Sequence, residues 1–203
     1  MNILIILEDF VNDESMVLPI VKAMMIAIGK PKARVTVCKN PRLRGHAEAL
    51  RWEKIQEILE RYGGMTDLFL VCIDRDGNKD RRAKLDGLEK KAQEFLADKY
   101  QSPKKFLGEN AWQELEVWVL AGCNDLPKSW NWSEIRAESK SKKGYFVQFA
   151  EQRSLLTARC QGRGILAVEA AKRYDRIRQR CPEDIKNLEE NIREWLAGSG
   201  NEV

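Results

Sequence analysis

The sequence predicts an α/β fold: a four-stranded parallel sheet flanked by helices, followed by a C-terminal helical extension. Short apolar runs of strand length alternate with longer amphipathic segments through the first 122 residues. This order, β-α-β-α-β-α-β-α, is typical of a parallel sheet with right-handed crossover helices. After residue 122 no strand pattern follows. We therefore divide the chain into an α/β domain, residues 1–122, and a polar loop with C-terminal helices, residues 123–203.

The first three elements are each marked by their length and their boundary residues. Residues 2–7 are apolar and stop at Glu8, which predicts a strand. Residues 14–28 carry apolar side chains at helical spacing and stop at Gly29, a usual end of a helix. Residues 33–38 alternate between apolar and polar and are rich in β-branched side chains, so they predict the second strand.

The remaining elements of the α/β domain follow the same logic. Residues 46–62 place apolar side chains on one face of a helix. Residues 67–73 are apolar throughout, as expected of a strand that is covered on both faces. Residues 81–100 form a long charged helix with an apolar stripe, residues 105–107 begin a fourth strand, and residues 113–121 are helical.

The second region is expected to contain only helices. Residues 123–144 are polar and irregular. Beyond them, two or three helices are predicted, over residues 145–157, 163–180 and 183–197, separated by glycines and by Pro182. The pattern does not decide whether these helices pack on the sheet or form a small appended bundle.

The composition excludes several classes of site. Charged residues make up 33% and hydrophobic residues 43% of the 203 residues, which is typical of a globular protein. The five cysteines include no CxxC pair, which argues against a disulfide framework or a structural zinc site. The single histidine, His46, excludes multi-histidine metal sites and most Ser-His-Asp and Cys-His arrangements. Any chemistry is therefore expected from carboxylates.

The overall charge and the ends of the chain suggest location and partners. The formal net charge of +4 permits contact with nucleic acid. No segment is long and apolar enough to span a membrane, and the apolar start lacks a basic region and a cleavage site. We therefore expect a cytoplasmic protein with no membrane partner.

Carboxylates follow two of the predicted strands. Glu8 ends the first strand, and the third runs directly into Asp74 and Asp76 of the sequence CIDRDG. Functional residues of parallel sheets gather at the carboxyl ends of the strands, so these side chains meet if the two strands are neighbours. Residues two apart in a strand share a side, so Asp74 and Asp76 are both expected to face one cation. Mg²⁺ or Mn²⁺ suits such oxygen ligands and offsets their mutual repulsion.

A purely structural interpretation stands beside this one. Asp-x-Asp-Gly is common in surface turns, because aspartate and glycine favour turn geometry. Asp80 is expected to cap the helix that follows it, and Asp13 to cap the helix over residues 14–28.

The strand-terminal glutamate of ILIILED, the later CIDRDG and the four-unit alternation together resemble the TOPRIM (topoisomerase–primase) fold. The segment ENAWQELEVWVLAG, residues 109–122, resembles a signature of small bacterial TOPRIM-like proteins of unknown function, related to the nuclease domain of overcoming-lysogenization-defect proteins. The resemblance covers residues 1–122. It implies an acid/base or metal role for Glu8 and metal binding by Asp74, Asp76 and Glu116.

The sequence departs from the family pattern at one position. The family's glutamate is commonly followed by glycine, whereas Asp9 and Phe10 follow Glu8 here. This change either crowds the approach of a phosphate or adds Asp9 as a ligand. Glu114 competes with Glu116 for the inward position, since residues two apart on a helix do not share a face; the motif favours Glu116.

Basic residues suggest how a nucleic-acid substrate would be held. Clusters at residues 30–44, 140–143 and 172–180 include the candidate contacts. A basic helix near an acidic metal site suits a phosphate backbone, although a charged helix face is usually only solvated. The candidate nucleic-acid contacts are Arg42, Arg44, Lys142, Lys143 and Arg173, with DNA expected in preference to RNA.

Three functional hypotheses remain open. The first is a Mg²⁺- or Mn²⁺-dependent nuclease or related phosphodiester-processing enzyme, in a phage-defence or DNA-repair setting, with Glu8 as the catalytic residue. The second is a non-catalytic TOPRIM-like partner of a separately encoded ATPase; the chain has no Walker A motif of its own. The third is a receiver-type signalling domain, which needs a fifth strand that the sequence after residue 122 does not offer.

Overall fold

The computed structural model describes residues 1–198, and its four strands form one all-parallel sheet in the order β2-β1-β3-β4. This confirms the predicted α/β fold. The strands are β1 (Asn2–Leu7), β2 (Arg34–Val37), β3 (Leu68–Asp74) and β4 (Lys105–Ala111). Since β1 lies between β2 and β3, the two strands that end in carboxylates are direct neighbours at the centre of the sheet.

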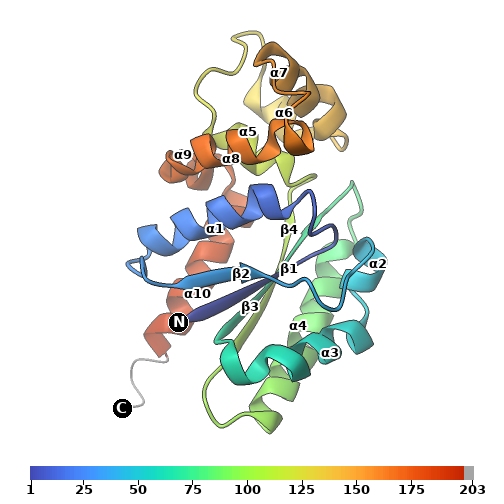
Figure 1. The fold of residues 1–203 in the computed structure, drawn as a ribbon, viewed down its shortest axis with the longest axis vertical. Helices are drawn as coiled ribbons and strands as arrows, with labels where there is room; N and C mark the ends of the chain where they lie inside the picture. The colour runs from blue at the N-terminus through green and yellow to red at the C-terminus, as the bar shows by residue number, and fades with distance from the viewer. Residues whose placement is uncertain (199–203) are drawn as a thin grey trace.

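Helices cover both faces of this sheet. On one face lie α1 (Glu14–Ala27) and α10 (Asn187–Gly198), and on the other lie α3 (Trp52–Tyr62) and α4 (Arg81–Lys99) (Figure 1). Each buries an apolar stripe, which explains why β3 is apolar on both sides. The short helix α2 (His46–Ala49) lies at the carboxyl end of the strands.

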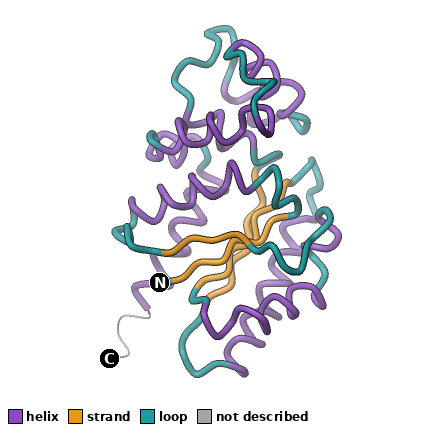
Figure 2. Tube along the Cα trace, in the orientation of Figure 1, coloured by secondary structure: helices purple, strands orange, loops and turns teal. Residues whose placement is uncertain are grey.

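The remaining helices gather at one end of the molecule, at the top of Figures 1 and 2, beyond α1 and the carboxyl end of β4. They are α5 (Glu116–Gly122), α6 (Trp132–Ala137), α7 (Val147–Gln152), α8 (Arg163–Ala171) and α9 (Tyr174–Arg180). Four short helical turns link elements of the chain: η1 (Gly63–Met65), η2 (Lys142–Phe146), η3 (Arg159–Gly162) and η4 (Pro182–Lys186).

Several boundaries differ from the sequence expectation for local physical reasons. The helix expected over residues 46–62 is broken at Arg51, whose backbone is extended, so α2 and α3 are separate. Strand β4 continues to Ala111 through polar residues, because it pairs with β3 along its whole length. Helix α6 lies in the region expected to be irregular; Trp130, just before it, packs edge-on against Tyr145 with ring centroids 5.0 Å apart.

The C-terminal helices share a hydrophobic core with the sheet. One core joins Ile5 of β1 and Met24 of α1 to Leu166 of α8, Ile177 of α9 and Ile192 of α10. A second core lies between the opposite face of the sheet and α3 and α4. The helices after residue 122 therefore pack on the α/β region, and the two regions share one hydrophobic core.

A buried carboxylate joins these helices to the end of the sheet. Asp184, 1% exposed, accepts hydrogen bonds from the backbone N–H of Trp112 at 2.9 Å and from the indole N–H of Trp118 at 2.7 Å. It also pairs with the guanidinium of Arg136 at 3.0 Å. One side chain of η4 thus holds the segment after β4, helix α5 and helix α6 together.

Within residues 1–198, the helices are all too short or too polar to cross a lipid bilayer. The longest, α4, carries charged residues along most of its length. Helix α1 is more apolar and has 14 residues, fewer than the roughly 20 that a bilayer crossing needs.

Replacing Asp184 tests the importance of this buried junction. We expect Asp184→Ala to lower the free energy of unfolding by about 3–5 kcal/mol, because it leaves Arg136 as a buried charge without its main partner. Glu183 pairs with the same guanidinium but is 49% exposed, so Glu183→Ala is the matched control and should cost less than about 1 kcal/mol. Urea denaturation followed by circular dichroism measures both, and equal losses would contradict this account.

Candidate active site

The carboxyl ends of β1 and β3 bring Glu8 and Asp74 together. Parallel pairing sets Leu7 opposite Cys72, so the residues that follow each strand lie at the same edge. Glu8 Oε1 accepts a hydrogen bond from the backbone N–H of Asp74 at 3.2 Å, and the Glu8 side chain is 12% exposed. Burial is the main cause that raises the pKa of Glu8, with the charge of Asp76 adding to it.

Asp74 lies beside Glu8 and is partly buried. Its Oδ1 accepts the backbone N–H of Leu115 at 2.8 Å, which ties the end of β3 to the start of α5. Burial, and then the neighbouring charges of Glu116 and Glu8, hold the pKa of Asp74 well above its usual range. The fold therefore keeps several carboxylates close enough to oppose each other's ionisation.

Asp13 belongs to this group, although its sequence position indicates a helix cap. It occupies the N-cap of α1, but its side chain makes no capping hydrogen bond to the helix. Its Oδ2 instead accepts the backbone N–H of Asp9 at 3.3 Å. Burial, followed by the charges of Glu116 and Glu8, raises the pKa of Asp13 to about 7. Its place in the loop between β1 and α1, just after Glu8, is the signal that could have identified it.

Asp76 lies close by but is engaged by an arginine. Its backbone is left-handed, with φ of 49°, as is that of Gly77, with φ of 69°. This turns Asp76 towards the buried Arg81, whose guanidinium is 3.1 Å from Asp76 Oδ2 and also donates to the carbonyl of Asp74. Asp76 is 47% exposed and pairs with Arg81, but its charge still contributes to the raised pKa of Glu8.

Glu116 is buried and is also engaged by an arginine. Its Oε1 accepts from Arg163 of α8 at 3.1 and 3.0 Å, and both side chains are less than 5% exposed. Lys142 Nζ lies 3.9 Å from the same oxygen. Glu114, the alternative considered for the inward position, is half-buried and accepts from Ser141 Oγ at 3.0 Å. Both glutamates thus contact the segment around Lys142, and Glu116 also binds Arg163 of α8.

Asp9, the residue that departs from the family pattern, is used by its own loop. Its Oδ1 accepts the backbone N–H groups of Val11 at 3.0 Å and Asn12 at 3.3 Å, and its Oδ2 accepts the Asn12 amide at 2.7 Å. Burial acts to raise the pKa of Asp9, but these hydrogen bonds outweigh it and the pKa is lowered. The guanidinium carbon of Arg42 lies over the Phe10 ring, 5.5 Å from the centroid of that ring.

A pocket of about 420 Å³ opens over these acids and carries both signs of charge. Glu8, Asp13 and Asp74 line it together with the side chains of Arg42 and Lys142 and with the loop that contains Arg44. The backbone N–H of Arg44 donates to the Glu48 carboxylate, and this hydrogen bond holds Arg44 in the loop. An acidic centre with basic residues around it is the arrangement that a cation and a phosphate require together.

The other two basic candidates lie elsewhere. Lys143 is exposed and does not line this pocket. Arg173 lines a separate hollow on α8, pairs with Glu169 at 3.7 Å and lies within 3.5 Å of the carbonyl of Gly122. The structure therefore places Arg42, Arg44 and Lys142 around Glu8 and Asp74, and does not place Lys143 or Arg173 there.

The acids of the described chain do not form an all-protein cage for a metal ion. Among residues 1–198, no group of three or more His, Cys, Asp or Glu side chains is arranged so that it could hold a metal ion. Mg²⁺, however, is usually held by one or two carboxylates, with water and substrate phosphate completing its shell. Glu8 and Asp74 each have one oxygen fixed by a backbone N–H. No hydrogen bond to Glu8 Oε2 or Asp74 Oδ2 is seen within the described chain.

Comparison of the chain with family models, characterised proteins and solved structures finds no significant match. The chemistry of the site therefore rests on its own residues. Those residues are two carboxylates, Glu8 and Asp74, with Glu8 Oε1 bound to the backbone N–H of Asp74 at 3.2 Å, a third carboxylate, Asp13, and surrounding cations.

The raised pKa of Asp13 predicts a pH-dependent effect on stability. An aspartate that titrates near 3.8 in the unfolded chain and at about 7 in the folded protein costs stability as it ionises. This destabilisation is absent at pH values below the pKa of the unfolded chain. It grows as the pH rises between the two pKa values and is complete above pH 7. We therefore expect Asp13→Asn to raise the free energy of unfolding by on the order of 4 kcal/mol at pH 8, and by well under 1 kcal/mol at pH 4.

Asp9→Asn is the matched control, because its pKa is lowered in the folded protein. Ionised Asp9 stabilises the native state above the unfolded pKa, so this variant should be less stable than wild type at pH 8. Thermal unfolding between pH 4 and pH 8 measures both effects. A gain from Asp13→Asn that does not change with pH would contradict the proposed repulsion.

Proposed function

We propose that this chain is a Mg²⁺- or Mn²⁺-dependent phosphodiester hydrolase that acts on nucleic acid. The observation that carries the proposal is the group of buried, mutually repelling carboxylates, Glu8, Asp13 and Asp74, in a pocket that also presents Arg42 and Lys142. Burying like charges without a counter-ion is unfavourable. Such a group is retained where it binds a cation or moves a proton.

The carboxylates support metal binding by their donor type. Asp74 would hold the cation through Oδ2, the oxygen that accepts no backbone N–H, and Glu8 would remain free to act as the base. Asp13 borders the same pocket and would add to the negative potential. When bound, a divalent cation would neutralise charge on the phosphate and lower the pKa of a bound water.

The other residues supply binding and proton transfer. Arg42 and Lys142 flank the pocket at positions where they can bind the oxygens of a phosphate backbone. Burial raises the pKa of Glu8, which makes it a stronger base than an exposed glutamate. Glu8 would accept the proton of the attacking water. His46 Nδ1 lies 4.0 Å from Glu8 Oε2, and a protonated His46 would stabilise the Glu8 carboxylate.

The resemblance to TOPRIM proteins supports the same function. It assigns acid/base or metal roles to Glu8, Asp74, Asp76 and Glu116. A phage-defence or DNA-repair setting, a cytoplasmic location, a preference for DNA over RNA and an ATPase partner rest on that resemblance and on sequence composition alone.

A second candidate function is a non-catalytic partner subunit of a separately encoded ATPase. The observation that favours it is that arginines already neutralise two of the four family acids. Arg81 pairs with Asp76 at 3.1 Å, and Arg163 pairs with buried Glu116 at 3.0 Å. A receiver-type signalling domain is not proposed, because the sheet in the described part of the chain has four strands and not five.

Replacement of Glu8 or Asp74 tests the hydrolase. We expect Glu8→Gln and Asp74→Asn each to lower Mn²⁺-dependent cleavage of plasmid and single-stranded DNA by at least about 100-fold, since each removes a charge that the reaction uses. Asp80→Asn is the matched control and should cleave as wild type does, because Asp80 is exposed at the same end of the sheet and its side chain makes no helix-capping bond.

Calorimetry with Mn²⁺ on the same proteins separates the two candidate functions. Binding that Asp74→Asn abolishes, together with cleavage that depends on Glu8, establishes the hydrolase. Binding without cleavage of any nucleic acid supports the partner subunit. Absence of both from the wild-type chain refutes metal-dependent hydrolysis by this chain alone.

A further inference from the structure

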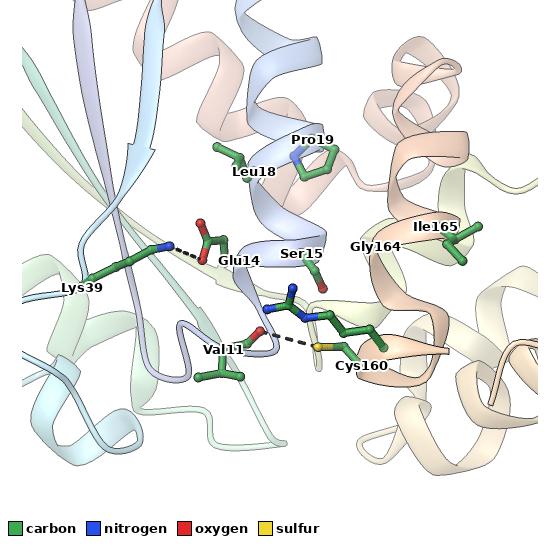
Figure 3. Close-up of a pocket in the computed structure, with 10 residues that line it drawn as sticks. Val11, Glu14, Ser15, Leu18, Pro19, Lys39, Cys160, Gly164 and Ile165 are labelled. Carbon is green, nitrogen blue, oxygen red and sulfur yellow. Dashed lines mark hydrogen bonds and ion pairs between the residues drawn. The ribbon is translucent and has the colours of Figure 1, made fainter. Parts of the chain in front are cut away.

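A second pocket, of about 530 Å³, lies on the other side of the loop that forms the acidic pocket. Figure 3 shows its two walls: the first turns of α1, with Glu14, Ser15, Leu18 and Pro19, and the start of α8, with Cys160 at its edge. Asp9, Phe10, Asn12 and Asp13 line the acidic pocket, whereas Val11, Glu14 and Ser15 line the second one. The two pockets therefore share the loop between β1 and α1 as a common wall.

One part of this second pocket is apolar and exposed. Leu18 and Pro19 lie on α1, and Ile165 lies on α8 (Figure 3). Ile165 is 54% exposed and Val11 is 45% exposed. Few large apolar side chains are left open in the described chain: Val11, Ile26, Met65, Ile165 and Val168. Two of these border the pocket, so it offers a flat ring an unusually apolar contact.

The other part of the pocket is cationic. Arg159 lines it and is exposed, and no carboxylate pairs with Arg159 within the described residues. Lys39 is 59% exposed and pairs with Glu14 at 3.0 Å, as Figure 3 shows. A ligand that combines an apolar ring with an anionic group matches this arrangement, since the ring covers Ile165 and the anion binds Arg159.

The backbone beside Arg159 is held in an unfavourable conformation. Cys160, Gln161 and Gly162 are all left-handed, with φ of 52°, 54° and 76°. Left-handed conformation in a residue other than glycine costs on the order of 1–3 kcal/mol and is concentrated at ligand clamps and active sites. Arg163 holds this turn, because its Nη1 donates to the carbonyl of Cys160 at 3.0 Å while its other nitrogens bind Glu116.

We infer that this second pocket binds an unpaired nucleotide of single-stranded nucleic acid, adjacent to the phosphate that lies in the acidic pocket. The inference rests on the proposed function, and it names the form of the substrate. A pocket of this volume is in the range of small-ligand sites and holds one nucleoside. A base that is stacked and paired in a duplex cannot enter it, so the strand must be single or locally unpaired.

Equilibrium binding tests this assignment separately from cleavage. The probe is a fluorescein-labelled 12-nucleotide single-stranded DNA, followed by anisotropy with Ca²⁺ in place of Mg²⁺. We expect Ile165→Ala to weaken binding about five-fold, because the base loses contact with side-chain carbons. Arg159→Ala should weaken binding and reduce the slope of log Kd against log salt by about one, as loss of one phosphate contact does.

Val168→Ala is the matched control. Val168 lies three residues from Ile165 on the same helix and is 53% exposed. It does not line the second pocket; it borders a neighbouring hollow that Ile165 also borders. It should bind the single strand as wild type does. A duplex of the same sequence should bind more weakly than the single strand, and Ile165→Ala should leave duplex binding unchanged.

The outcomes separate the two proposals. Equal binding by Ile165→Ala and Val168→Ala, or no binding of single strands by the wild type, overturns the nucleotide pocket. Binding that depends on Ile165, without Mn²⁺-dependent cleavage, keeps the pocket and refutes the hydrolase. Cleavage that depends on Glu8 but not on Ile165 keeps the hydrolase and refutes the pocket.

Discussion

Parallel pairing of β1 with β3 places Glu8 and Asp74 at one buried edge of the sheet, and much of the surrounding structure compensates for that concentration of charge. Backbone N–H groups bind one oxygen of each acid. Arginines on α4 and α8 pair with Asp76 and Glu116, the acids next to them. Asp13 has no such cation and titrates at about 7. The compensation is therefore partial, and what remains is a negative centre suited to a shared cation.

The C-terminal helices are part of the same arrangement. Arg163 and Lys142 both lie beyond residue 122, yet both reach Glu116 at the end of the sheet. Asp184 of η4 binds Trp118 of α5 and Arg136 of α6 in the interior, which fixes η4 and α6 relative to α5. A division of the chain after residue 122 describes the order of the elements, but the site is built from both sides of it.

The loop between β1 and α1 contributes residues to both pockets. Asp9 organises this loop through three hydrogen bonds, so the residue that replaces the family's glycine has a structural role here. Asp13, at the end of the loop, lines the acidic pocket, and Glu14, the first residue of α1, lines the pocket beside α8. A strand of nucleic acid that passes over this loop would meet both pockets in turn, phosphate first and base second.

The sequence by itself determined the α/β fold and the meeting of Glu8 with Asp74, because strand periodicity and parallel alternation are local signals with one common arrangement. It did not determine what Asp13 and Asp76 do. Asp13 fits a capping rule, and only the packing of α1 against the sheet directs its carboxyl to the other acids. The rule that residues two apart share a side assumes that the strand continues, whereas the left-handed backbone at Asp76 turns its side chain to Arg81. Arg163 was equally hidden, since its pairing with Glu116 spans 47 residues and depends on tertiary packing alone.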